Sequence, residues 1–249
     1  FNAAFPNIAS NYKIVSKIKD LEHYIQKEHD DIENTLNYVN TNVQNLLYIL
    51  ETNKFIEKNA DKKYCLTRKG DIASHVHEIH CLLIGDLYEE GYFENMTTPD
   101  LVGFFSCFCN LRVTDDYKEF DCPSQYDLIY KTVHRSNQII NSYLDNEKYY
   151  SLYKACENFE LQYDFVHYSY IWSSLVNNET QAKKIINEAK VNKNIFLGEF
   201  IKSLLKINNI AAEFENVCEI TNNMKLLQKI KAIPDSTLKY IATNQSLYV

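Results

Sequence analysis

The segment that decides the fold runs from residue 97 to residue 111 and reads TTPDLVGFFSCFCNL. Its first residues predict a helix start, because Thr97 or Thr98 can cap free backbone N–H groups and Pro99 suits the first helical turn. The residues that follow, 101–111, are apolar on nearly every side of a helix. A surface helix has only one apolar face. We therefore expect this helix at the centre of the fold.

Apolar residues at three- and four-residue spacing extend the helical prediction to most of the chain. They predict helices over 14–29, 31–50, 72–90, 126–144, 148–161, 164–175, 195–218 and 224–233, and a last one from Pro234 to Val249. The 249 residues include only 5 glycines and 4 prolines, too few for the tight turns of a sheet-rich fold. The predicted fold class is mainly α, a multi-helix bundle over 71–249.

A different pattern precedes the bundle. Two short β-prone pieces, 55–56 and 64–66, flank a polar turn and predict a hairpin directly after a helix. A helix followed by a short hairpin is typical of the end of a winged-helix module, although a plain helix–loop–helix would give a similar pattern. We therefore predict a linker over 1–12, a helical, winged-helix-like segment over 13–70 and the C-terminal helical bundle over 71–249.

Charge is unevenly spread along the chain. The net charge is −7, but residues 181–249 hold ten lysines against six acidic residues, a balance of +4, and residues 1–180 carry −11. A polyanion is therefore expected to contact the last third. Only three arginines are present, so lysines would have to bind phosphate as point charges.

Cysteine usage and hydropathy bear on the compartment. Seven cysteines, an odd number without a Cys-x-x-Cys pair, lie mostly in apolar patterns and predict reduced, buried thiols. No stretch approaches ~18 consecutive apolar residues, so no membrane partner is expected. The first six residues also lack the pattern of a secretory signal. We expect an intracellular protein, cytoplasmic or nuclear.

Common catalytic motifs are missing from the chain. No glycine is followed by lysine, so there is no phosphate-binding P-loop, and neither a Gly-x-Ser-x-Gly nor a His-Glu-x-x-His motif occurs. His77 could share a metal with His80 or Cys81, but nothing nearby completes a tetrahedral set, which favours a half-buried helix with surface histidines. We predict no catalytic residue, metal site or cofactor in this chain.

Several stretches in order resemble one family. They are Gly70 to Ala73, the turn Glu90-Gly91-Tyr92-Phe93, Phe105-Ser106-Cys107-Phe108, Tyr170-Ile171-Trp172, the glycine-led helix from Gly198 to Lys206, and the final Ser246 to Val249. Together they resemble the C-terminal helical domain (DSHCT) of superkiller-type DExH-box RNA helicases, the enzymes that feed RNA to the exosome. The resemblance covers residues 65–249 and is weakest over 112–160.

The resemblance implies a function for the whole polypeptide. The chain would be a non-catalytic C-terminal region that caps a helicase core, with ATP and Mg²⁺ bound in that core, upstream of Phe1. Its partners would be single-stranded RNA, the helicase core of the same polypeptide, and exosome or adaptor proteins. In this family a long helix of the terminal bundle lines the RNA channel.

The longest predicted helix, 195–218, supplies candidate RNA-binding residues. Lys202 and Lys206 stand one turn apart on its polar face, where their ammonium groups can meet phosphates, and Asn209 can hydrogen-bond a base edge or sugar. A purely solvated helix face has the same pattern.

Two other functions fit the sequence. The chain could be a free-standing helical adaptor, for example a viral one, that kept the bundle and binds proteins. It could also be a DNA-binding regulator that uses 31–70, although the acidic balance of residues 1–180 argues against this.

Overall fold

A computed structural model describes residues 8–150, 152, 160–176 and 178–240. The chain divides into two units, residues 1–49 and residues 50–249, and each is described by itself. The structure is mainly helical with one small hairpin, as the sequence predicts. Among the helices of the described ranges, none has both the length and the apolar content of a membrane span.

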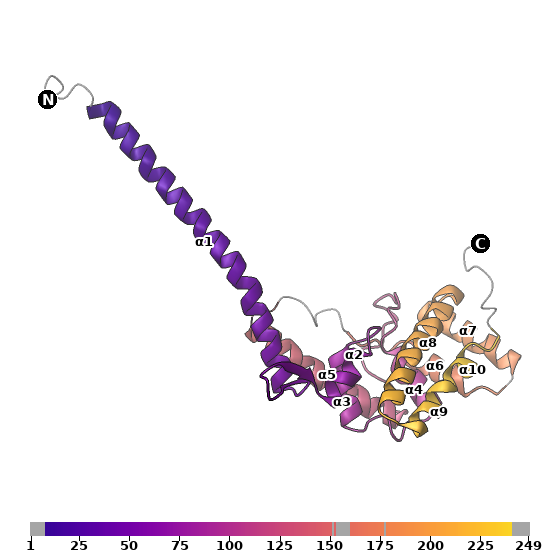
Figure 1. Cartoon of the computed structure of the whole chain (residues 1–249). Helices are drawn as coiled ribbons and strands as arrows, with labels where there is room; N and C mark the ends of the chain where they lie inside the picture. The colour runs from indigo at the N-terminus through magenta and orange to yellow at the C-terminus, as the bar shows by residue number, and fades with distance from the viewer. Residues whose placement is uncertain (1–7, 151, 153–159, 177, 241–249) are drawn as a thin grey trace. The chain divides into compact units, whose positions relative to one another are not determined.

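The described part of the N-terminal unit belongs to one long helix, α1, which runs from Ile8 to Thr52 (Figure 1). The predictions of two helices, 14–29 and 31–50, and of a linker reaching residue 12 are wrong for the described residues. No glycine or proline occurs between residues 8 and 52, and the acidic pair at 30 and 31 is tolerated inside a helix. The predicted apolar stripe is present, but most of its side chains are exposed, for example 45% for Val43 and 68% for Leu36.

The hairpin lies where the sequence predicts it. Strand β1 (Ile56–Lys58) pairs antiparallel with β2 (Tyr64–Leu66), with Ile56 opposite Leu66. Phe55, just before β1, is only 2% exposed, and its carbonyl accepts a backbone hydrogen bond from Thr67 at 3.0 Å. This closes the base of the hairpin. The winged-helix assignment of residues 13–70 stays a prediction.

The predicted helix over 72–90 is interrupted. Helix α2 (Arg68–Ser74) and helix α3 (Cys81–Glu89) are joined by a loop over residues 75–80. The break has a local cause, because the ring Nδ1 of His80 accepts a hydrogen bond from the backbone N–H of Leu83 at 3.1 Å and caps α3. Val76 and Ile79 in the loop are buried, which fixes its course.

The central helix of the bundle is α4 (Thr98–Ser106). Thr97 and Asp100 form a capping box at its start, as the Thr-Thr-Pro-Asp pattern predicts. All of its residues from Asp100 to Ser106 are buried. The helix packs against α5 (Asp127–Tyr149), α6 (Val166–Ser174), α8 (Leu197–Ile220) and α9 (Met224–Lys231). The expectation of a central position is confirmed.

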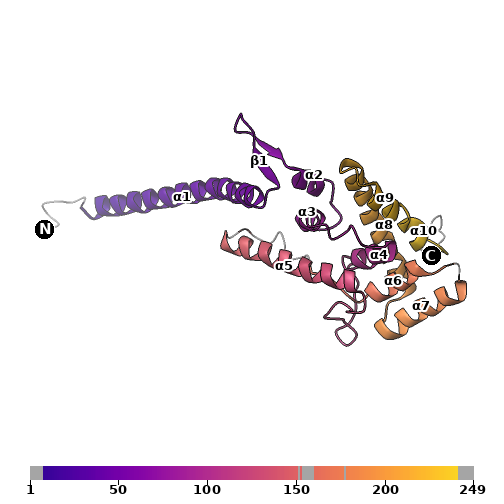
Figure 2. The same cartoon turned by 90° about the horizontal axis from the view of Figure 1, so that it is seen from below.

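The other helices of the bundle lie on α4 or on its neighbours, since α7 (Glu179–Lys193) and α10 (Ile233–Thr237) pack on α6 and α8 (Figure 2). The predicted helix over 148–161 falls largely on residues outside the described ranges, and so does the C-terminal half of the one predicted from Pro234. Helix α7 was not predicted.

Aromatic rings fill the centre of the bundle. Phe214 of α8 contacts Phe93 and Phe105, with ring centroids 5.2 and 4.7 Å apart. Trp172 of α6 is 2% exposed, and its indole N–H donates to the carbonyl of Thr237 at 2.8 Å. The core therefore fixes α8 along its length, which determines the direction of its polar face.

Candidate nucleic-acid interface

Helix α8 has one buried and one polar face. Its buried stripe packs against α4, α7, α9 and α10 and consists of Phe200, Ser203, Leu204, Ile207, Ile210, Ala211, Phe214, Val217 and Cys218. The polar face carries the predicted site residues in the order Lys202, Lys206 and Asn209, followed by Glu213. We call these four residues the α8 strip. It spans about 16 Å of helix axis at 1.5 Å per residue.

Lys202 is the most accessible cation of the α8 strip, with a side chain that is 66% exposed. Its ammonium lies 3.4 Å from the carboxylate of Glu199, one turn earlier on the same helix. Such exposed pairs contribute about 0.2–1 kcal/mol, so water and ligands compete easily with them. Lys202 is therefore available to an anion in solution.

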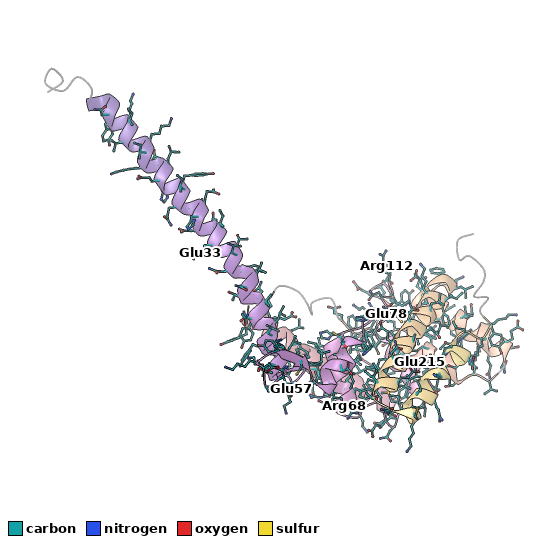
Figure 3. The ribbon with its side chains drawn as sticks, in the orientation of Figure 1. Glu33, Glu57, Arg68, Glu78, Arg112 and Glu215 are labelled. Atoms are coloured by element: carbon teal, nitrogen blue, oxygen red, sulfur yellow. The ribbon has the colours of Figure 1, made fainter. Side chains whose placement is uncertain are left out.

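Lys206 lies one turn further on and is held more firmly. Its ammonium donates to the backbone carbonyl of Glu78 at 2.9 Å and also contacts the Glu78 carboxylate. Both side chains are about one third exposed, at 32% for Lys206 and 35% for Glu78. The structure thus brings Lys206 together with a carboxylate from the loop between α2 and α3, beside α8 (Figure 3).

Asn209 is exposed, and its position on the α8 strip is between Lys206 and Glu213. Glu213 faces the same loop as Lys206. Its carboxylate accepts hydrogen bonds from the backbone N–H of His77 at 3.0 Å and of Glu78 at 3.0 and 3.2 Å. One end of the α8 strip therefore meets the loop, whereas Lys202 lies at the other end.

The loop histidines do not gather around a common point. His75 ends α2 and lies 3.8 Å from Asp71, and His80 is 6% exposed with its Nδ1 bonded to the backbone. Burial lowers the pKa of His80, which favours the neutral ring. Within the described residues, no group of three or more His, Cys, Asp or Glu side chains could hold a metal ion.

The contacts that Lys206 and Glu213 make with Glu78 were not predicted from the sequence. The sequence identified Lys206 as a candidate site residue, but it did not connect Lys206 or Glu213 to Glu78. The partners of Glu78 lie 128 and 135 residues away in the chain, so no local spacing links them. Glu78 lies in a segment whose pattern predicts a helix, and an acidic residue there does not by itself indicate a contact with a distant helix.

A comparison with protein families places this fold. The model described as the DSHCT (NUC185) domain matches residues 63–241. The chain belongs to the DSHCT family. This is the C-terminal domain of superkiller-type helicases, so the chain is a helicase-associated C-terminal region. The comparison with curated proteins finds no match.

The structure explains two motifs of the DSHCT domain. Trp172, in the Tyr-Ile-Trp motif, packs against Phe200 with ring centroids 5.1 Å apart and is a core residue, as expected for a large aromatic. Gly70 is required by close packing, because a Cβ there would lie 1.9 Å from the carbonyl oxygen of Phe55. Gly198 has no such constraint, since a Cβ there meets nothing within 4 Å.

Proposed function

We propose that the chain is the C-terminal accessory region of an ATP-dependent RNA helicase, in which the α8 strip lines the path of single-stranded RNA. The observation that supports this proposal best is the exposure of Lys202 and Asn209 on the polar face of α8. Membership of the DSHCT family gives the helicase context.

In this proposal the site residues act by electrostatics and hydrogen bonding. Lys202 and Lys206 neutralise successive phosphates, and Asn209 hydrogen-bonds a base edge or a sugar. Each neutralised phosphate contributes about −0.7 to the slope of log K against log salt for single strands. Two lysines cannot bind RNA tightly alone, so the helicase core has to supply most of the affinity.

The catalytic chemistry would belong to the rest of the polypeptide. ATP and Mg²⁺ would bind in the helicase core, and the DSHCT domain would cap that core and couple its motion to strand movement. Exosome or adaptor proteins are further proposed partners. No residue of this chain is assigned a catalytic role.

The test compares two exposed lysines in the full-length protein. Lys202→Ala removes the proposed phosphate contact, and Lys183→Ala is the matched control, because Lys183 on α7 is 76% exposed and pairs with Glu179 as Lys202 pairs with Glu199. Binding of a labelled oligouridylate is measured by anisotropy over a range of salt. We expect the salt slope to fall by about 0.7 for Lys202→Ala only. Equal slopes in both variants would show that Lys202 does not contact RNA.

The alternative, a free-standing helical adaptor, is favoured by one observation, the exposed apolar stripe of α1. Soluble proteins rarely leave a long apolar surface uncovered, and such surfaces commonly bind proteins. The coding sequence upstream of Phe1 separates the two functions. A phosphate-binding lysine and an Asp-Glu-x-His box there support the helicase, and a nearby start codon supports the adaptor.

A further inference from the structure

The loop over residues 75–80 is attached to the polar face of α8 from two sides. Glu213 accepts the backbone N–H groups of His77 and Glu78, and Lys206 donates to the carbonyl of Glu78. Val76 and Ile79 bury their side chains, at 2% and 3% exposure. The backbone of Glu78 is therefore fixed beside the α8 strip independently of its own carboxylate.

The two contacts of Lys206 differ in kind. The carbonyl of Glu78 belongs to the fixed loop backbone, whereas its carboxylate ends a side chain that is 35% exposed and can rotate into water. An ammonium group has three donors, so one donor can stay on the carbonyl while the others change partner. Lys206 thus donates one hydrogen bond to a fixed, neutral carbonyl and one to a carboxylate that can move away.

We infer that the Glu78 carboxylate is a built-in competitor for RNA phosphate at Lys206, and that RNA binding to the α8 strip displaces it. The inference rests on the proposed function and adds its regulation. A carboxylate and a phosphate present similar anionic oxygens to an ammonium group, and both cannot neutralise it fully at once. Lys202, at the other end of the strip, remains accessible, so RNA can bind there before Glu78 moves.

The competition is weak enough for RNA to overcome. An ion pair exposed to this degree contributes about 0.2–1 kcal/mol, which corresponds to roughly a 1.4- to 5-fold change in affinity. The competitor therefore lowers the affinity for isolated anions and short RNA, whereas a strand that is also bound by other sites displaces it. Strands bound only at the α8 strip dissociate more readily as a result.

The experiment removes the charge of Glu78 and keeps its shape. Glu78→Gln preserves an acceptor oxygen and the backbone contacts of the loop, and Glu188→Gln is the control, because Glu188 pairs with Lys184 on α7 and the change of net charge is identical. Binding of an oligouridylate of about 20 nucleotides is measured at low salt in the full-length protein. We expect about 1.4- to fivefold tighter binding for Glu78→Gln. Glu188→Gln should show only the smaller gain that comes from losing one negative charge anywhere on the domain.

A second pair of variants tests whether the gain acts through Lys206. In a Lys206→Ala background the gain from Glu78→Gln should vanish, because the competition has no cation to act on. A gain that persists there, or equal gains for Glu78→Gln and Glu188→Gln, would overturn the inference. If Lys202→Ala weakens binding while Glu78→Gln does nothing, the proposed RNA path is supported and only the inference about Glu78 is refuted. If neither lysine affects binding, the proposed function fails, and the inference with it.

Discussion

Two glycines of the DSHCT domain should respond in opposite directions to the same substitution. At Gly70 in α2, an added Cβ would lie 1.9 Å from the carbonyl oxygen of Phe55 and 2.9 Å from its carbonyl carbon. Both are backbone atoms at the base of the hairpin, so no side-chain rotation can relieve the overlap. At Gly198 in α8 the added Cβ meets nothing within 4 Å, so Gly198→Ala is a control for helix propensity.

The expected magnitude follows from these contacts. Relief of the overlap requires the Phe55 backbone to move by about 1 Å, and forced overpacking of this kind costs about 1–3 kcal/mol. The movement also weakens the hydrogen bond from Thr67 to the Phe55 carbonyl, about 1 kcal/mol more. Alanine has a higher helix propensity than glycine, which offsets up to about 1 kcal/mol of this loss. We therefore expect a net loss of about 1–3 kcal/mol for Gly70→Ala and a gain of up to about 1 kcal/mol for Gly198→Ala.

Thermal and urea unfolding measure both effects. For a domain of this size, 1 kcal/mol shifts the melting temperature by about 2–4 °C, so Gly70→Ala should melt roughly 2–12 °C lower. Gly198→Ala should melt at or slightly above the parent temperature. A Gly70→Ala protein as stable as the parent would show that α2 does not pack on Phe55 at this distance. A comparable loss in Gly198→Ala would show that the helix propensity reasoning is wrong.

Three further predictions concern buried polar groups and thiols. Lys193→Met should destabilise the bundle by about 1–3 kcal/mol, measured by urea unfolding, because Asp164 is 3% exposed and loses its cation 3.6 Å away. Burial lowers the pKa of His80 below 6.5, so the folded state binds fewer protons and the free energy of unfolding falls as pH drops through 6.5. His80→Asn keeps a capping acceptor and should show a weaker dependence between pH 7.5 and pH 5. Iodoacetamide should modify Cys65, which is half-buried, before Cys109, whose pKa burial raises to about 12; peptide mass spectrometry reads the order.

Local signals allowed much of the fold to be predicted. The hairpin and the start of α4 were found because their chemistry lies within a few residues, in a polar turn and in the Thr97–Asp100 capping box. The break between α2 and α3 was missed because its cap is a histidine, and because Glu213 holds the loop from far along the chain. Helix α7 was missed because its buried face has few large residues, mainly Ala182, Ile185 and Ala189.

The candidate site could be predicted only in part for the same physical reason. The spacing of Lys202, Lys206 and Asn209 follows from helical geometry, and the structure places Lys202 and Asn209 in solvent. What spacing cannot supply is the partner of each charge. Lys202 pairs with Glu199 on its own helix. Lys206 pairs with Glu78, on a loop that lies beside α8 only in the folded bundle.

The lysines of residues 181–249 hold segments of the bundle together, in addition to giving this part of the chain its positive charge. Several donate to backbone carbonyls of distant segments at 2.6–2.9 Å: Lys193 to Tyr117, Lys206 to Glu78, Lys229 to Glu94 and Lys239 to Leu175. A carbonyl does not neutralise an ammonium group, so these bonds restrict the side chains without removing their charge. Lys193 and Lys206 also pair with carboxylates. Binding an anion to a cation that is already ordered costs less conformational entropy than binding it to a free lysine. These four lysines are therefore fixed cations, and under the proposed RNA path the Glu78 carboxylate is the group that a phosphate would displace at Lys206.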